Sequence, residues 1–342
     1  MNILVTSAGR RGYIIRFFKE ALQGQGKVYA GNSTAFSSAF AYADESVVTP
    51  LIYEQEYIPF LIEYCQEKQI EVIISLFDVD LYVLAQHQDE FREMGIRVIV
   101  SNENIISICN DKWLTYRWAK EHNIEVPNTY LKVDAVTQEI AESKINYPVV
   151  VKPRWGMGSI GIFIADNEQE LMVFYLKCKE KIQNSYLKYE AAFDFENCVI
   201  IQEMISGNEY GMDVINDLNG KFCTNVVRKK IAMRSGETDC AVVVRDEQMD
   251  LLAEKLGKEL KHVGNLDVDV FQSDERIVLL EMNARFGGGY PFSHYAGINL
   301  PGAIVKWLEG KELEDELEIK KYGEILQKDI GFVNLTCFTR GL

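Results

Sequence analysis

The stretch that decides the fold is Val149-Val-Val-Lys-Pro-Arg-Trp-Gly-Met-Gly-Ser-Ile-Gly-Ile-Phe-Ile-Ala165, two apolar runs separated by a glycine-rich segment. Residues 156–161 satisfy the pattern G-x-G-x-x-G, which in dinucleotide-binding folds follows a strand and opens a helix. Here residues 162–165 are too few for a helix and rich in β-formers, and a helix start signal appears only near Asp166. The segment is therefore predicted to join two strands, 148–152 and 161–165, as a loop whose backbone N–H groups can close over phosphates.

Lys152 stands at the end of the first of these strands, where its ammonium group can reach the same phosphates. The alternative is an ordinary hairpin with a solvated lysine, and this segment alone favours neither interpretation. The sequence contains no G-x-x-x-x-G-K-[ST] motif, so a P-loop is excluded.

Residues 1–100 alternate short apolar runs with stretches of helical spacing. Strands are predicted at 2–6, 27–30, 72–76 and 97–100, and helices at 13–22, 58–67 and 81–94. This alternation is typical of a parallel sheet covered on both faces, whose ligands bind beyond the C-terminal ends of the strands. An open α/β domain is therefore predicted for residues 1–100.

The pattern changes after residue 101, and the rest of the chain indicates an α+β arrangement. Helices are predicted at 111–122, 168–182, 246–263 and 296–308, with Asp166 and Asn167 marking the start of the second. Strands are predicted at 199–202, 210–215, 222–227 and 241–244, mostly antiparallel, followed by a hairpin of 266–272 and 276–282. The tail from Leu313 carries no clear signal.

An acidic cluster lies on the predicted hairpin near the C-terminus. Asp269 and Glu281 occupy opposite arms, so pairing across the turn at 273–275 can bring them side by side. Glu281, Asn283 and Arg285 alternate along one arm and are expected to share a face. Two carboxylates and an amide oxygen suit Mg²⁺, and an adjacent arginine suits a phosphoryl or carboxylate group. The alternative is a solvated strand face, but the apolar residues 278–280 and the glycines 287–289 argue against it.

The composition of the 342 residues is ordinary for a globular protein, with 47% hydrophobic and 25% charged residues. The formal net charge of −15 is spread along the chain and disfavours nucleic acid or an anionic membrane as the main partner. The N-terminus lacks a signal-peptide pattern, and no run approaches the ~18 apolar residues of a membrane span. Seven cysteines without a Cys-x-x-Cys pair indicate scattered thiols in a reducing compartment, so a cytoplasmic location is expected.

Taken in order, these features make the sequence resemble the ATP-grasp superfamily, in particular its carbamoyl-phosphate-synthase-like and D-alanine-ligase-like branches. The resemblance covers nearly the whole chain. The segment Asn110-Asp-Lys112, followed by Ile124-Glu-Val-Pro127, resembles the family's first nucleotide lysine and its downstream proline. Residues 149–161 resemble the second lysine and the phosphate lid, and residues 202–210 resemble the hinge between the two lobes.

The resemblance implies an N-terminal open parallel-sheet, Rossmann-like domain at 1–100 followed by a two-lobed ATP-grasp fold. The first lobe is expected at 101–195 with the glycine-rich lid, and the second at 196–312 with the hinge and the metal site. Residues 313–342 are then a C-terminal extension. The implied cofactors are ATP and Mg²⁺, with Mn²⁺ as an alternative metal. The implied partners are a small-molecule carboxylate, an amine and a second copy of the chain in a homodimer.

The resemblance also assigns roles to individual residues. The backbone around Glu203 to Ile205 is expected to meet the adenine edge, and Glu209 to accept the ribose hydroxyls. The complete nucleotide-binding set is Lys112, Lys152, Gly156, Gly158, Ser159, Gln202, Glu203, Ile205 and Glu209. The expected metal ligands are Asp269, Glu281 and Asn283, and the expected catalytic groups are Lys152, Arg234 and Arg285.

The reaction implied by the family is attack of a carboxylate oxygen on the γ-phosphate, which gives ADP and an acyl phosphate. An amine, or less often a thiol, then displaces phosphate. Two alternatives stay open, carboxyphosphate or kinase chemistry of the carbamoyl-phosphate-synthase type and a non-catalytic ATP-binding regulatory module. Carbamoyl phosphate synthases usually have arginines where Lys112 and Lys152 stand and a histidine near Arg234, and this chain has no duplicated half. These departures favour a small stand-alone ligase. A Rossmann dehydrogenase is disfavoured because residues 9–12 lack the middle glycine.

Substrate specificity is expected from the N-terminal domain and from the loop after the metal strand. Arg10 and Arg11 are candidates to grip an anionic group, and Asp78 and Asp80 to meet an ammonium group. Interdomain salt bridges or a solvated rim are the slightly favoured alternative for both pairs. Residues 291–294 form a candidate substrate loop, in which a structural role for His294 is favoured over a general base. For Arg234, a solvated side chain and a contact with substrate are equally weighted.

Overall fold

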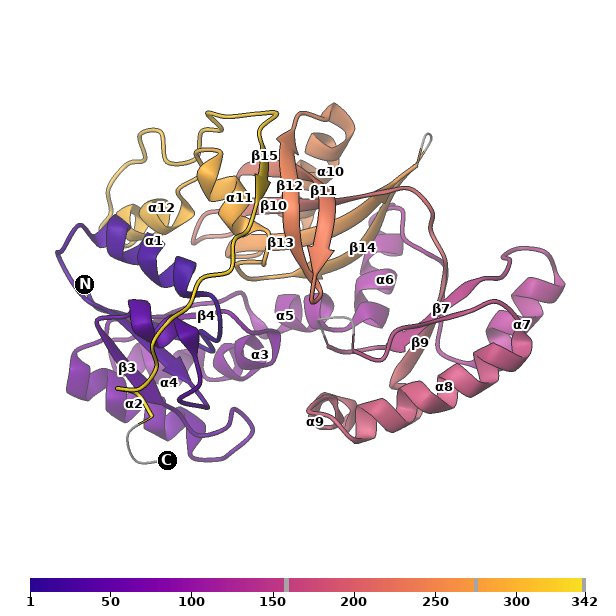
Figure 1. Ribbon diagram of the computed structural model, residues 1–342, viewed down its shortest axis with the longest axis horizontal. Helices are drawn as coiled ribbons and strands as arrows, with labels where there is room; N and C mark the ends of the chain where they lie inside the picture. Colours follow the sequence, from indigo (N-terminus) through magenta and orange to yellow (C-terminus); the bar gives the residue numbers. More distant parts are fainter. Residues whose placement is uncertain (157–159, 274–275, 340–342) are drawn as a thin grey trace.

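The structure is a computed structural model that describes residues 1–156, 160–273 and 276–339 (Figure 1). Within these residues the longer strands assemble into a parallel sheet and two antiparallel sheets. In the same residues no helix is long and apolar enough to cross a membrane.

The N-terminal sheet is parallel, as predicted, with the strand order β3-β2-β1-β4-β5. Its strands are β1 (Ile3–Thr6), β2 (Val28–Asn32), β3 (Glu45–Val48), β4 (Val72–Ser75) and β5 (Arg97–Ile99), and its helices are α1 (Gly12–Leu22), α2 (Tyr57–Lys68), α3 (Asp78–Gln86) and α4 (Gln88–Glu93). The edge strand β3 was not predicted, because its residues are only partly buried and lack an apolar run. The single helix predicted at 81–94 is wrong, because the chain leaves helical geometry at His87, which separates α3 from α4.

Two consecutive helices, α5 (Glu103–Asn110) and α6 (Lys112–Glu121), connect this sheet to the rest of the chain. The second was predicted and the first was not. Asn102 caps α5 by accepting from the Ile105 N–H at 3.0 Å. Asp111 caps α6 by accepting from the Trp113 N–H at 2.9 Å, so Lys112 is the first residue of that helix.

The glycine-rich segment joins two antiparallel strands, β7 (Val149–Pro153) and β8 (Phe163–Ala165), as predicted. They belong to a small sheet of order β6-β9-β7-β8, completed by β6 (Thr129–Tyr130) and β9 (Val199–Glu203). The helices of this part are α7 (Val133–Ala141), α8 (Glu168–Gln183) and α9 (Leu187–Ala191). Helix α8 starts where predicted, with the Asn167 side chain accepting from the Glu170 N–H at 3.0 Å. Figure 1 shows α8 running back from this sheet, so that α9 at its end lies toward α3.

The second antiparallel sheet has the order β14-β13-β10-β11-β12-β15. Its strands are β10 (Asn208–Asn216), β11 (Phe222–Arg234), β12 (Glu237–Val244), β13 (Gly264–Gln272), β14 (Ile277–Asn283) and β15 (Ile325–Gln327). The hairpin of β13 and β14 is confirmed, and β11 and β12 extend beyond their predicted ends. Helix α10 (Glu247–Leu260) packs on β10 and β11, within the helix predicted at 246–263, and the Asp246 side chain caps its start.

The helix predicted at 296–308 is wrong in its first turn. Instead α11 (Tyr290–Tyr295) ends before Gly297, whose φ of +123° is incompatible with a helix, and α12 (Leu300–Leu308) begins after Asn299. The Asn299 side chain caps α12 by accepting from the Gly302 N–H at 3.0 Å.

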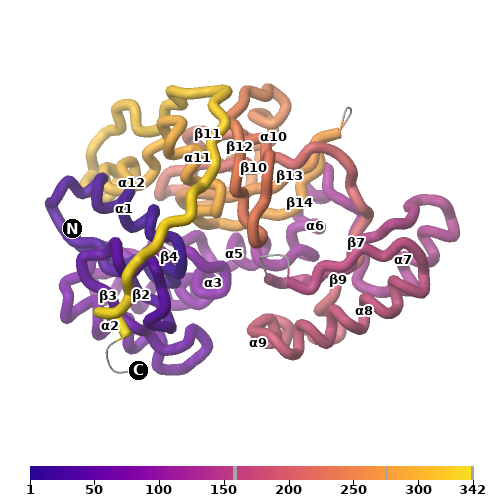
Figure 2. The backbone as a smooth tube through the Cα atoms, viewed as in Figure 1, coloured from indigo at the N-terminus to yellow at the C-terminus, as the bar shows by residue number. Residues whose placement is uncertain are grey.

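The C-terminal tail, for which the sequence carried no clear signal, adds β15 to the edge of the large sheet beside β12. In Figure 2 the tail then continues along the molecule to the N-terminal sheet, where the rings of Phe338 and Phe40 lie 5.8 Å apart. The tail therefore bridges two parts of the molecule that are far apart in sequence.

A fully buried ion pair joins the centre of the large sheet to α11. Arg228 of β11 is 1% exposed and pairs with Asp213 of β10, which is 0% exposed. The Ser293 hydroxyl and the Asn265 side-chain amide donate to the same carboxylate at 2.6 and 2.9 Å. A buried charge without its partner retains the full cost of leaving water, so this carboxylate is a sensitive point of the fold.

We expect Asp213→Ala to lower the free energy of unfolding by about 3–5 kcal/mol, because it removes the main partner of the buried Arg228 charge and leaves only Asp267, at 3.5 Å. Urea unfolding followed by circular dichroism measures this loss. The matched control is Asp89→Ala, which removes an ion pair with Arg92 whose side chains are 83% and 72% exposed. This control should hardly change the free energy of unfolding, because solvent-exposed ion pairs contribute little to stability. Equal effects of the two substitutions would contradict the assignment.

Candidate active site

A cavity of about 180 Å³ lies between the glycine-rich segment and the β13–β14 hairpin. Charged side chains from five elements line it, namely Lys112, Lys152, Glu209, Asp269 and Glu281. The sequence motifs that were assigned to nucleotide and metal binding therefore meet in space, although they are spread over residues 112–281.

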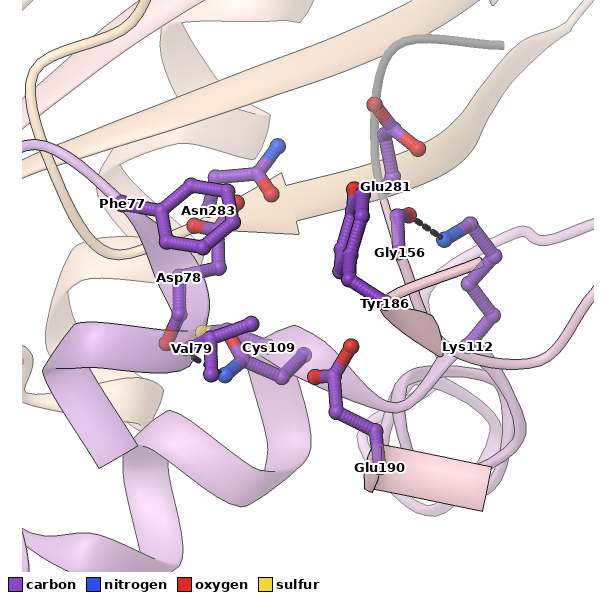
Figure 3. Close-up of a pocket in the computed structure, with 11 residues that line it drawn as sticks. Phe77, Asp78, Val79, Cys109, Lys112, Gly156, Tyr186, Glu190, Glu281 and Asn283 are labelled. Carbon is purple, nitrogen blue, oxygen red and sulfur yellow. Dashed lines mark hydrogen bonds between the residues drawn. The ribbon is translucent and has the colours of Figure 1, made fainter. Parts of the chain in front are cut away.

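Lys112 is tied to the glycine-rich segment. Its Nζ donates to the Gly156 carbonyl oxygen at 2.6 Å, as Figure 3 shows. Its backbone N–H donates to the Arg154 carbonyl oxygen at 3.1 Å. Gly156 itself has a φ of +102°, and a Cβ there would lie 2.4 Å from the Leu187 side chain. Gly158 and Ser159, which were also assigned to the phosphate lid, lie outside the described residues.

Lys152 projects into the same cavity from β7. Burial and, to a lesser degree, the neighbouring Lys112 lower the pKa of this lysine to about 8, although Glu281 acts in the opposite direction. Within the part of the chain that the structure describes, its ammonium group has no hydrogen bond or ion pair. A buried lysine without a partner is a natural site for an anionic oxygen.

Asp269 and Glu281 face each other across the hairpin, which confirms the predicted pairing. The strand register shifts immediately beside them, because Val270 pairs with Leu279 and Leu280 is left over as a β-bulge. Burial raises the pKa of Asp269 to about 7; Lys230 opposes this shift, while Asp267 and Glu281 add to it. Burial also raises the pKa of Glu281, but Lys112 and the other nearby cations outweigh burial and hold it below its usual value.

The donor set fits a hard divalent cation. Asn283 lines a small adjoining cavity together with Glu281, and Figure 3 shows both side chains above Asp78. Two carboxylates and an amide oxygen are suitable ligands for Mg²⁺. Burial is the main cause of the raised pKa of Asp269, and Asp267 and Glu281 add to it, so a bound cation would stabilise the charged carboxylate. Among the described residues no three His, Cys, Asp or Glu side chains gather closely enough to hold a metal, so the Asn283 amide would be needed as a third ligand.

Lys230 is a site residue that the sequence analysis missed. Its Nζ lies 2.6 Å from the Glu209 carboxylate and 2.6 Å from the Asp269 carboxylate. Burial lowers the pKa of Lys230, but these two carboxylates outweigh burial and raise it above its usual value. The sequence pattern that could have identified Lys230 is the alternation of side chains along β11. This strand continues past its predicted end at residue 227, which places Arg228 and Lys230 on one face.

Of the residues assigned to the hinge, Glu209 lines the cavity beneath the glycine-rich segment, whereas Gln202, Glu203 and Ile205 do not. Gln202 is buried and donates to the Thr129 hydroxyl at 2.8 Å. The Glu203 carboxylate accepts from the backbone and side-chain N–H groups of Asn128 at 3.2 and 3.0 Å. Ile205 follows β9, and its backbone N–H has no partner among the described residues.

The two arginines assigned to catalysis are engaged elsewhere in this structure. Strand β14 ends at Asn283, so the expected alternation does not extend to Arg285. The Arg285 guanidinium is buried 2.8 Å from the Asp78 carboxylate and 3.6 Å from Asp267. Arg234, whose side chain is 44% exposed, pairs with Asp239 of the adjacent β12 at 2.9 Å.

The candidate specificity residues of the N-terminal domain mostly form contacts between domains. Arg11 donates to the carbonyl oxygens of Leu76 and Phe286 at 3.0 and 2.9 Å and pairs with Glu237 at 3.3 Å. Asp78 pairs with Arg285, whereas Arg10 is exposed.

The candidate role of Asp80 in binding an ammonium group is contradicted, because its carboxylate is inaccessible to solvent and already accepts several hydrogen bonds. The residue is 0% exposed and accepts hydroxyl hydrogen bonds from Thr6, Tyr57 and Ser75 at 2.6–2.7 Å.

His294 has a structural role, which is the interpretation that the sequence favoured. Its ring stacks on Phe17 at 3.6 Å, and burial lowers its pKa to about 4.

Glu190 of α9 is the second residue that the sequence analysis missed. It lines the small cavity of Figure 3 as well as a larger neighbouring cavity. One of its carboxyl oxygens is buried without a hydrogen-bond partner among the described residues. No sequence signal marked it, because α9 is five residues long and lies within a stretch for which no element was predicted.

Comparison with known proteins places this geometry in a family. Residues 109–289 match the family model described as ATP-grasp domain, and residues 3–99 match that described as PylC-like, N-terminal domain. The chain is 23% identical over 303 residues to the arginine-specific carbamoyl phosphate synthase large chain of Geobacillus stearothermophilus, covering 85% of this chain and 27% of that one. The match to this chain spans between a fifth and about a quarter of the length of the curated relatives.

Solved structures share the fold at low sequence identity. The biotin carboxylase domain of 2-oxoglutarate carboxylase from Hydrogenobacter thermophilus, determined with MgADP, ADP and bicarbonate, superimposes with a TM-score of 0.72 at 19% identity, covering 95% of this chain and 73% of that one. N5-carboxyaminoimidazole ribonucleotide synthetase from Thermotoga maritima gives a TM-score of 0.66 at 18% identity, covering 93% and 78%. Because the ATP-grasp model covers more than half of the residues and these structures carry the same fold, the chain belongs to the ATP-grasp family.

Proposed function

We propose that this chain is a Mg-ATP-dependent, ADP-forming ligase that activates a small-molecule carboxylate as an acyl phosphate and joins it to an amine. The observation that carries the proposal is the convergence of two lysines, Lys112 and Lys152, with the facing carboxylates Asp269 and Glu281 in one cavity. Polyphosphate bridged by a divalent cation matches this arrangement of charge, since the lysines can contact phosphate oxygens and the carboxylates the cation. The MgADP-bound structural neighbour supports the same assignment.

The proposed mechanism relies on positioning and on neutralising charge. A Mg²⁺ ion held by Asp269, Glu281 and Asn283 would supply charge neutralisation at the phosphates. Lys152 would bind phosphate oxygens with an ammonium group that has no other partner in the described structure. Lys112 is bonded to the Gly156 carbonyl, so its contact with phosphate would be coupled to the position of the glycine-rich segment. That segment, with Gly156, Gly158 and Ser159, would exclude water from the acyl phosphate.

The hinge is proposed to bind the adenosine part of the nucleotide. The free Ile205 N–H supports a hydrogen bond to the adenine edge, while Gln202 and Glu203 hold the hinge in place. Glu209 would accept the ribose hydroxyls from its position on β10, where it now pairs with Lys230. Arg285 and Arg234 remain proposed partners of the transferring group, and Arg234 has to leave Asp239 to act.

The oligomeric state, the cellular location and the lobe boundaries of the protein belong to the same proposal. A homodimer is supported by the neighbouring biotin carboxylase domain, whose structure is that of a dimer. All seven cysteines are free thiols, which supports a reducing cytoplasmic location. The proposed boundaries of the two ATP-grasp lobes stay at 101–195 and 196–312.

A coupled ADP-release screen tests the function. Mg-ATP is offered with amino acids, small carboxylates and bicarbonate, each with and without a panel of amines. ADP release that depends on one carboxylate and is followed by amide formation supports the ligase. Release of AMP and pyrophosphate would overturn the mechanism, and failure to bind MgADP in a calorimeter would overturn the nucleotide site.

We expect Glu281→Gln to reduce turnover on the order of 100-fold or more, because it removes a charge from the proposed metal site. Calorimetry adds a second readout. ADP should bind the wild type more tightly with Mg²⁺ than without it, and the variant should lose this difference. Glu93→Gln, an exposed carboxylate on α4, is the matched control. A Glu281→Gln variant with normal turnover would refute the metal assignment.

The affinity for MgADP should fall as the pH rises from about 7 to about 9.5, by up to roughly tenfold per pH unit. The reason is that Lys152, whose pKa is about 8, is charged at the lower pH and loses its proton at the higher pH. In Lys152→Arg the charge persists throughout this range, so the affinity should be nearly independent of pH. Titration calorimetry at several pH values measures how the affinity for MgADP changes with pH in the wild type and in Lys152→Arg. Equal slopes in the two proteins would show that another group titrates.

A further inference from the structure

A second cavity of about 510 Å³ adjoins the candidate active site. It lies between the helices of the N-terminal domain and α9 of the small-sheet lobe, and aromatic side chains form much of its wall. These are Tyr53, Tyr82, Trp155, Tyr189 and Phe193. Polar and charged side chains, among them Asp111, Arg154 and Asp194, complete the wall. A cavity of this size that combines aromatic surface with polar groups is a typical binding site for a small molecule.

The two sides of this cavity touch through ring contacts. Tyr53, which precedes α2, stacks on Tyr189 of α9 with ring centroids 4.0 Å apart. Tyr82 of α3 and Phe193 lie 6.5 Å apart at a steep angle. Phe193 is nonetheless 78% exposed, so a large apolar ring stands open to solvent. An apolar or aromatic ligand would cover this ring and lie between the two parts of the chain.

Glu190 lies where this aromatic cavity meets the small cavity of the active site, and it lines both. Figure 3 shows its carboxylate directed into the small cavity, across which Glu281 and Lys112 lie. Its Oε2 atom is buried without a hydrogen-bond partner among the described residues. A buried carboxyl oxygen without a hydrogen-bond donor lowers the stability of the folded protein. A ligand that donates a hydrogen bond to this oxygen would remove that cost.

The other charged groups around Glu190 are mostly neutralised by each other. Asp111 and Asp194 pair with Arg154 at 2.7 and 3.0 Å, and Asp78 pairs with Arg285 at 2.8 Å. Lys112 is bonded to Gly156, and His87 pairs with Glu90 at 2.7 Å. The Glu190 carboxyl group is itself either negative or neutral. It would therefore repel a carboxylate ligand and attract an ammonium group.

We propose that Glu190 binds the ammonium group of the second substrate, a primary amine with an apolar or aromatic body, and removes a proton from it for attack on the acyl phosphate. This proposal rests on the ligase function proposed above. The amine body would occupy the aromatic cavity, and its nitrogen would point past Glu190 toward the nucleotide site.

The step balances in atoms and charge. Glu190 takes one proton from the ammonium group, and the freed nitrogen lone pair forms a C–N bond to the acyl carbon. The C–O bond to phosphate breaks, and its electron pair leaves with the phosphate. The second proton lost from nitrogen goes to the departing phosphate, and Glu190 later releases its proton to water. Burial raises the pKa of Glu190 to about 7, with Asp78 adding to the shift and Lys112 opposing it, which suits a general base near neutral pH.

Amine binding is tested by calorimetry on the MgADP-bound protein with 2-phenylethylamine, tyramine and hexylamine. At least one should bind, and Glu190→Gln should weaken that binding at least tenfold while leaving the affinity for MgADP unchanged. The neutral analogue, 2-phenylethanol or its hexanol counterpart, should not distinguish the two proteins. Glu196→Gln, a nearby side chain that is 84% exposed, is the matched control. If MgADP binds and none of the amines does, this inference fails and the ligase proposal stands; if MgADP itself does not bind, the ligase proposal fails.

The role as a base needs a second readout, which uses the carboxylate identified in the ADP-release screen. Hydroxylamine is largely unprotonated at neutral pH and traps acyl phosphates without the help of a base. Glu190→Gln should therefore still form hydroxamate, while its amide product falls about 100-fold or more. Phe193→Ala should raise the KM for the amine and leave MgADP binding intact. Equal loss of hydroxamate and amide, or an undiminished amide rate, would overturn the assignment of Glu190.

Discussion

The constraint on which this structure depends is the pairing of charges that the fold removes from water. Isolated buried charges are costly, so each must have an opposite partner in good geometry. Arg228 meets Asp213 between β11 and β10, Arg285 meets Asp78 across the boundary of the N-terminal domain, and Lys230 meets Asp269 within the large sheet. Because each pair joins different elements, the requirement for pairing also fixes how those elements lie around the active site.

The glycines 287–289 show how closely this network is packed. A Cβ on Gly287 would lie 2.0 Å from the Asp267 side chain, and one on Gly289 would lie 2.7 Å from the Arg228 guanidinium. A Cβ on Gly288 would lie 2.9 Å from the Glu237 side chain. The Asp267 and Arg228 side chains are held in buried ion pairs, so a Cβ at Gly287 or Gly289 would force this network to shift, whereas the partly exposed Glu237 side chain could move away from one at Gly288. The backbone at Gly287 and Gly289 therefore forms one wall of the charge network.

The sequence predicted those parts of the site whose geometry depends on short-range spacing. Asp269 and Glu281 could be placed opposite each other because a tight hairpin sets its own register. Lys152 could be placed at the loop because strand and loop are adjacent in sequence. Lys230 was missed because its role depends on how far β11 extends, and Glu190 because α9 is positioned by ring contacts with a distant domain. The buried setting of Asp80 could not be predicted either, since only the fold brings Thr6, Tyr57 and Ser75 around it.

The exceptions to charge pairing are the most informative residues of the molecule. Within the described residues, Lys152, Glu281 and Glu190 are charged groups lining the cavities that lack a hydrogen-bonded or ion-pair partner. Lys152 lies with the nucleotide-site carboxylates, and Glu190 lies at the entrance to the aromatic cavity. These three groups suit the proposed ligands, with Lys152 and Glu281 for the phosphates and their cation at one end and Glu190 for an ammonium group at the other. This arrangement agrees with the proposal that an acyl phosphate and an amine meet between Lys152 and Glu190.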